Sequence, residues 1–296
     1  MTYTGSSGHD TADDVSSRSF VAPDEKTNAM LVSARGTVRL RLIDVLRMPM
    51  PDQPSWRART AIRTFAALGR RQVRAIYGLE NIAPGREPFI LALSHNINRE
   101  AVMVPGLLML LRGGRYIHFL ADWGLLLFPV LGWLVRHAGA IIVTSKGAGA
   151  MTFLRPLFEQ PTSSAVRMRA ALEEGRSVGV FPEGTVTRDP NNLLYGRAGT
   201  ARLSLETGVP VVPAGIRFPD APRDRPLDDR EPLEVHIGAA LHPPPIAGDK
   251  PSLSEGRAWH ATIMREIAHL SGKEWQPTAK RDRDRGKRSR NGRKTA

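Results

Sequence analysis

The chain has 296 residues, of which 41% are apolar, enough for one generous domain with a substantial core. It has no cysteine, which excludes disulfides, cysteine-ligated zinc, iron–sulfur clusters and thiol nucleophiles and fits a cytosol-facing setting. The 42 Lys and Arg residues outnumber the 29 Asp and Glu residues, and the net charge of +13 favours an anionic partner such as nucleic acid, phospholipid or a phosphorylated substrate.

The positive charge is concentrated in two segments. Residues 279–296 hold nine basic and two acidic side chains, and residues 56–77 hold six arginines and no acid, so their net charges of +7 and +6 account for the whole excess. We predict that residues 1–35 and the basic tail at 277–296 are disordered, because both are poor in apolar residues. An alternative function for the tail is nonspecific binding of nucleic acid, since no motif indicates a specific nucleic-acid partner.

Residues 36–77 are typical of basic amphipathic helices that associate with a membrane. Ser55 is a suitable N-cap, and apolar or small residues recur at steps of three and four from Ala58 to Ile76, beside the arginines. Such a helix fits an anionic bilayer surface. An ordinary amphipathic helix packed on its own domain explains the pattern equally well. The candidate membrane contacts are Trp56, Arg63, Phe65 and Arg70.

The apolar runs at 101–111 and 123–135 are shorter than the roughly 20 residues that span a bilayer, so we expect no transmembrane helix. The first apolar run follows a long polar stretch, which is unlike a secretory signal. We therefore expect a peripheral protein at the cytoplasmic face of the cell membrane.

Residues 78–276 alternate between strand-like and helix-like patterns. This alternation predicts an α/β domain with a largely parallel central sheet flanked by helices. The expected helices are 101–111, 164–174, 198–207 and a last helix that begins after Ser252 and ends at Gly272. The expected strands are 88–94, 138–144, 177–181, 211–217 and 233–239.

The loop after the first of these strands, residues 94–100, carries an imidazole and a carboxylate. His95 and Glu100 can meet only if the intervening residues form a turn before the helix begins, because a separation of five places side chains on different helix faces. A histidine oriented by a carboxylate is a general base. Taken alone, the pair is more typical of an ordinary hydrogen-bonded contact than of a catalytic site.

A second loop, residues 181–189, follows the strand at 177–181. Gly184 allows close approach of the backbone to a ligand, Thr185 offers a hydroxyl group, and Arg188 offers a bidentate contact to phosphate. A polar turn without function is the simpler interpretation. No ligand spacing in the chain calls for a metal.

Together these loops resemble the glycerolipid acyltransferase family, which includes the bacterial lysophosphatidate acyltransferases. The family's four blocks have counterparts in the same order over residues 78–240. They are His95–Glu100, Gly139–Lys146 (GAIIVTSK), Phe181–Thr185 (FPEGT) and Val209–Pro213 (VPVVP).

The resemblance implies transfer of a fatty acyl group from acyl-CoA or acyl carrier protein to a lysolipid hydroxyl, with 1-acyl-glycerol-3-phosphate as the expected acceptor. It implies that His95 is the base, that Glu100 orients it, and that no cofactor is needed beyond the acyl donor. Glu183, Gly184 and Thr185 are then residues of the acceptor site. Acyl transfer to a different lipid or glycolipid on the same fold remains an alternative.

The chain departs from the family pattern at three positions. Glu100 stands where the family has Asp, Ser145 stands at the family's arginine position, and Val186 follows the FPEGT block where an arginine is common. The last two changes affect groups that are expected to hold the acceptor's phosphate. The candidate phosphate contacts are therefore Lys146, Arg188 and Arg99.

Overall fold

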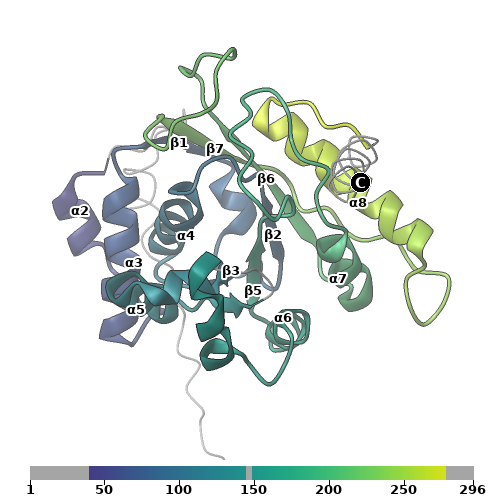
Figure 1. Cartoon of the computed structure of the whole chain (residues 1–296), viewed down its shortest axis with the longest axis horizontal. Coiled ribbons are helices and arrows are strands. Elements are labelled where there is room, and N and C mark those ends of the chain that lie inside the picture. The colour runs from purple at the N-terminus through teal and green to yellow at the C-terminus, as the bar shows by residue number, and fades with distance from the viewer. Residues whose placement is uncertain (1–39, 145–148, 278–296) are drawn as a thin grey trace, which may run out of the picture.

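A seven-stranded sheet forms the centre of residues 40–144 and 149–277, the part of the chain that the computed structural model describes (Figure 1). The strand order is β1-β7-β6-β2-β5-β3-β4, and neighbouring strands are parallel except for the pair β6 and β7. The prediction of a largely parallel sheet is confirmed. The strands are β1 (Val73–Tyr77), β2 (Ile90–Leu93), β3 (Ile117–Asp122), β4 (Ile141–Val143), β5 (Ser177–Val180), β6 (Val211–Arg217) and β7 (Leu233–Ile237).

Helices cover both faces of the sheet (Figure 1). On one face lie α3 (Trp56–Gly69), α4 (Glu100–Leu111) and α5 (Pro129–His137), with the short α2 (Leu42–Arg47) beside α3. On the other face lie α6 (Ser164–Glu173), α7 (Gly199–Thr207) and α8 (Leu253–Ser271). Three 3-10 segments complete the described chain: η1 (Leu79–Ile82), η2 (Trp123–Leu127) and η3 (Gly149–Phe158).

The core has two layers because successive strand residues point to opposite faces of the sheet. In β2, Leu91 and Leu93 join the apolar cluster under α3 and α4, whereas Ile90 and Ala92 join the cluster under α6, α7 and α8. Burial on both faces explains why this strand is a continuous apolar run. Strands β2 and β5 are parallel neighbours, so the loops that follow them emerge side by side.

The last helix shows how closely local signals can set an element's ends. The Ser252 hydroxyl accepts from the backbone of Glu255, and the Glu255 carboxylate accepts from the backbone of Ser252, so the predicted capping box is present. Gly272 ends α8 in the left-handed conformation, with φ 66°.

Residues 56–77 do not form a single helix. Helix α3 ends at Gly69, and Val73–Tyr77 is instead the edge strand β1, paired in parallel with β7. The apolar spacing in the sequence continues past Gly69 because Val73 and Ile76 are buried as well, as residues of β1. The sheet therefore begins before residue 78, and the predicted boundary between a membrane segment and the domain lies inside the core.

The apolar stripe of α3 faces its own domain. Phe65 is 3% exposed, and a Cβ added to Gly106 would lie 2.3 Å from the Phe65 Cβ, so α3 and α4 pack in close contact. The prediction that Phe65 enters a membrane is therefore wrong, and the packed-helix interpretation of this stripe holds. Arg63 donates to the carbonyl of Met48 and Arg70 to that of Ala67, so both cations are tied to the domain. Trp56 remains 65% exposed.

The sequence reading did not identify β3 or α5. The apolar run at 123–135 divides into η2 and the first part of α5, which Pro129 begins. Within residues 40–144 and 149–277, none of the helices combines the length and the apolar character needed to cross a bilayer. The predicted disorder of residues 1–35 concerns residues outside the described chain, as does that of the tail from residue 278.

Candidate active site

His95 and Glu100 lie together at the carboxyl end of β2. Residues 95–99 form the expected turn, α4 begins at Glu100, and Nδ1 of His95 lies 3.1 Å from Oε1 of Glu100. The Glu100 side chain is fully buried, and its Oε1 also accepts from the backbone N–H of Asn96. The carboxylate is thus fixed on one side of the imidazole, which leaves Nε2 as the ring nitrogen available to a substrate.

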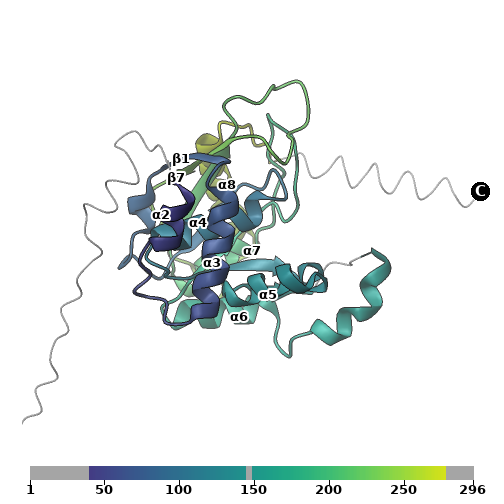
Figure 2. The same cartoon turned by 90° about the vertical axis from the view of Figure 1, so that its left-hand side faces the viewer.

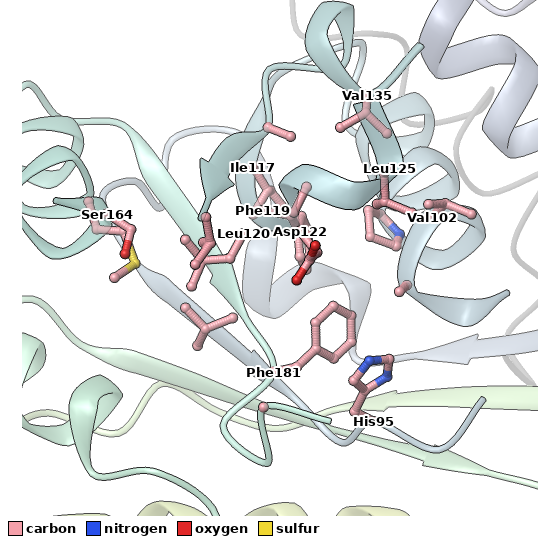
Figure 3. A pocket seen from close by; sticks show the side chains of 18 of the residues that line it. His95, Val102, Ile117, Phe119, Leu120, Asp122, Leu125, Val135, Ser164 and Phe181 are labelled. Atoms are coloured by element: carbon pink, nitrogen blue, oxygen red, sulfur yellow. The ribbon is translucent and has the colours of Figure 1, made fainter. Parts of the chain in front are cut away.

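The imidazole stands at the edge of a cavity of about 520 Å³ (Figure 3). Its side chain is 14% exposed, and its ring packs on Phe181 of the second loop with 4.5 Å between the ring centroids. Pro182 and Gly184 of the FPEGT block line the same cavity. The two loops that the sequence singled out therefore share one hollow.

Most of the cavity wall is apolar. The wall extends from His95 between α4, β3 and α5, where it is formed by Pro105, Met109, Phe119 and Val135 among others. Figure 3 shows Asp122 pointing into this space from the end of β3. The Asp122 side chain also caps η2 by accepting from the backbone N–H of Gly124 over 2.8 Å.

Glu183 lies behind the cavity and does not belong to its wall. Its Oε1 accepts from the backbone N–H of His95 over 2.7 Å, and its Oε2 accepts from that of Leu194 over 2.8 Å. Burial raises the pKa of this carboxyl to about 7, although both backbone donors and the charge of Lys273 oppose the shift. The expectation of a direct acceptor contact is not met, because Glu183 instead joins the two loops.

The candidate phosphate contacts are not gathered at the cavity. Arg188 has a left-handed backbone with φ 53°, and its guanidinium donates to Oδ2 of Asp229 over 2.6 Å and to the carbonyl of Leu227 over 2.9 Å. Arg99 is exposed and does not line the cavity, and neither does Thr185. Lys146 lies outside the described residues.

Two basic residues of the site were missed by sequence reasoning. Arg197 lines the cavity beside Gly184, and its guanidinium has no ion pair with any described residue. Its position between Gly196 and Gly199 at the start of α7 was an available signal for a ligand contact. Lys273, just beyond α8, reaches the back of the site, and nothing in its local sequence indicates this.

Residues 73–217 are an acyltransferase domain, and the comparisons support the resemblance to the glycerolipid acyltransferase family. The family model described as Acyltransferase matches residues 73–217, which include both loops. The chain is 28% identical over 142 residues to a chloroplastic 1-acyl-sn-glycerol-3-phosphate acyltransferase of Brassica napus, and the match covers 47% of this chain and 35% of that protein.

A further curated relative and one solved structure are similar to the chain. A lyso-ornithine lipid O-acyltransferase of Pseudomonas aeruginosa is 29% identical over 120 residues, covering 38% of this chain and 41% of that protein. The chain thus spans less than half the length of each of these two curated relatives. The crystal structure of the 1-acyl-sn-glycerophosphate acyltransferase PlsC from Thermotoga maritima has a TM-score of 0.50 at 18% identity and covers 79% of this chain and 88% of that one, which shows a shared fold.

Proposed function

We propose that this protein is an O-acyltransferase that moves a fatty acyl group from acyl-CoA or acyl carrier protein to a lysophospholipid hydroxyl. The expected acceptor is 1-acyl-glycerol-3-phosphate, and the product is then phosphatidate. The observation that carries the proposal is the pairing of His95 with buried Glu100 at the edge of an apolar cavity. The name of the Brassica napus relative supports this acceptor.

The geometry suits direct transfer between donor and acceptor. With Nδ1 held by Glu100, Nε2 of His95 takes the proton of the acceptor hydroxyl as its oxygen attacks the thioester carbonyl. A carbon–oxygen bond forms, the carbon–sulfur bond breaks, and the proton passes from the imidazole to the departing thiolate. No acyl-enzyme is required, which agrees with the absence of cysteine from the chain.

The cavity has the character of a site for an acyl chain. Its volume of about 520 Å³ lies in the range typical of small-molecule sites, and side chains such as Met109, Ile117 and Leu125 supply an apolar wall. An acyl chain bound there would bring its thioester to the His95 end.

A different lipid acceptor is the second candidate, and the position of Arg188 favours it. Arg188 was a candidate cation for the acceptor's phosphate, but its guanidinium is already paired with the carboxylate of Asp229. Arg197 is a guanidinium on the described part of the cavity wall, and it can bind a phosphate or a carboxylate equally well. The relative that acylates a lyso-ornithine lipid is consistent with an acceptor without phosphate.

We also propose that the protein docks peripherally on an anionic bilayer. The docking surface consists of exposed apolar side chains on η3 and at the start of α5, with its N-cap: Phe128, Val130, Met151, Phe153 and Leu157. Residues 123–158 contain three Lys or Arg residues and no Asp or Glu, so an anionic surface suits them. In Figure 2 the 149–158 segment stands away from the body of the domain, beyond α5. Leu125 and Val135, next to this surface, line the cavity, which fits a lipid substrate.

The test is an acyl-transfer assay with the purified full-length chain. One radiolabelled acyl donor, supplied as acyl-CoA or acyl carrier protein, is offered to lysophosphatidate, a lysophosphatidylcholine and a lyso-ornithine lipid. We expect a radiolabelled diacyl product with lysophosphatidate. A product with another lysolipid alone would move the assignment to the second candidate, and no product with any acceptor would overturn the proposal.

Variants of the histidine pair tie the activity to the site. His95→Ala should abolish turnover, and Glu100→Gln should lower kcat by about a hundredfold or more, because the imidazole loses its orienting charge. His242→Ala is the matched control, since His242 is exposed and outside the cavity. Circular dichroism should show that all three variants keep the fold.

A further inference from the structure

A buried ammonium lies behind the candidate active site. Lys273 follows the end of α8 and lies outside the residues that the family model matches. The residue is only 8% exposed. Its Nζ donates to Oδ1 of Asn96 in the first loop and to the backbone carbonyl of Asp189 in the second loop.

These bonds link Lys273 to the His95–Glu100 pair through one residue. Asn96 is next to His95, and its backbone N–H donates to Oε1 of Glu100, the oxygen that faces the imidazole. The two loops are also joined directly, because the N–H of Thr187 donates to the carbonyl of His95 and that of Arg188 to the carbonyl of Asn96. Lys273 therefore stabilises the contact between the two loops, one of which carries the His95 imidazole.

The buried charge of Lys273 interacts with a small set of carboxylates. The carboxylates that interact with it are those of Glu183, Glu100 and Asp189, and the first two are buried. Buried carboxylates that face one another repel, and each favours a bound proton unless a cation compensates. An imidazole beside uncompensated carboxylates would likewise hold a proton, and a protonated imidazole is no base.

We propose that Lys273 is a positioning residue of the acyl-transfer site, which orients Asn96 and balances the buried carboxylates so that His95 is free to accept the acceptor's proton. The proposal rests on the proposed function, in which His95 is the base. Lys273 does not line the cavity, so it acts on the imidazole loop and not on either substrate.

The test compares pH profiles of wild type, Lys273→Met and Lys273→Arg. In Lys273→Met we expect the acid limb of kcat/KM to move up by about one pH unit, the lower end of the effect of a neighbouring charge. Near neutral pH, kcat should fall about tenfold or more, while KM for donor and acceptor changes less than about threefold. Lys273→Arg keeps the charge and should keep the acid limb in place, even where its rate is lower.

Two further variants make the outcome decisive. Lys273→Gln keeps a hydrogen-bond donor without the charge and replaces Lys273→Met where the latter does not fold. Lys250→Met removes an exposed lysine and should leave the profile unchanged. A Lys273→Met profile that superimposes on the wild-type profile after scaling would show a packing role only, and so would a Lys273→Arg limb that moves as far as that of Lys273→Met.

A second readout does not depend on activity. In protein labelled at its eight histidines, the His95 ring resonance is assigned by its loss in His95→Gln and followed against pH. Its titration midpoint should move to higher pH in Lys273→Met. If the wild-type chain acylates no lysolipid but this shift is found, the proposed function fails and the positioning role stands; an unchanged midpoint overturns the role.

Discussion

The backbone N–H of His95 donates to Oε1 of Glu183 over 2.7 Å, so a carboxylate of the second loop holds the residue that carries the imidazole. The other carboxylate oxygen of Glu183, Oε2, accepts a hydrogen bond from the backbone N–H of Leu194. Because both oxygens are used in this way, a change at Glu183 displaces the base and does not remove a substrate ligand. Loss of activity in a Glu183 variant would therefore not identify the acceptor site.

Glu183 should make the protein less stable as the pH rises. Burial raises its pKa to about 7 in the folded chain, compared with an ordinary value of 4.5. Between these values the folded state holds a proton that the unfolded state has released, so the free energy of unfolding falls with rising pH, by up to about 3 kcal/mol. The check is denaturant unfolding of wild type and Glu183→Gln between about pH 5 and about pH 8. The variant should show the shallower decline, and parallel curves would contradict the assignment.

Arg197 should matter more for the acceptor than Arg188. Arg197→Ala removes a cation from the cavity wall and should raise the acceptor KM about tenfold, as expected for a lost charged hydrogen bond. Arg188→Ala should change that KM little, because its guanidinium already binds Asp229 and Leu227. Steady-state kinetics with the acceptor identified in the panel assay decides between them. A large KM effect in Arg188→Ala alone would show that the ion pair opens to admit the acceptor.

The alternation of strand-like and helix-like segments was enough to predict the largely parallel sheet. Parallel neighbouring strands expose their carboxyl ends at one edge, so His95 and the FPEGT block had to emerge close together once β2 and β5 paired. The spacing of His95 and Glu100 showed that the two side chains could meet only across a turn, and residues 95–99 form it.

Other features depended on long-range contacts that no local pattern records. Arg188 was predicted to hold a phosphate, but Asp229, 41 residues away, binds it. Lys273 reaches Asn96 across 177 residues, and β1 needs β7 as its partner. The stripe of α3 has the same spacing whether a membrane or α4 covers it, so only the fold could show that α4 does.

The contact between α3 and α4 should be sensitive to a single methyl group. In Gly106→Ala the new Cβ would lie 2.3 Å from the Phe65 Cβ, so the helices must separate, at a cost of about 1–3 kcal/mol in the free energy of unfolding. Gly256→Ala is the matched control, because it is also in a helix and its Cβ would meet no described atom within 4 Å. It should be neutral or stabilise the fold by up to about 1 kcal/mol through helix propensity. Thermal and denaturant unfolding measure both, and equal effects would contradict the close packing.

Membrane binding should depend on η3 more than on the arginines of α3. Phe153 and Leu157 are each about three quarters exposed, and burial of two such side chains in a bilayer is worth about 3 kcal/mol or more. Phe153→Glu with Leu157→Glu should therefore weaken sedimentation with anionic vesicles at least about tenfold. Arg63→Glu with Arg70→Glu should have a smaller effect, because both guanidinium groups donate to carbonyls of their own domain. Leu253→Glu, on the exposed start of α8, is the control and should bind as wild type does. If the η3 variant binds vesicles as tightly as wild type while the arginine variant does not, the bilayer contact lies at α3.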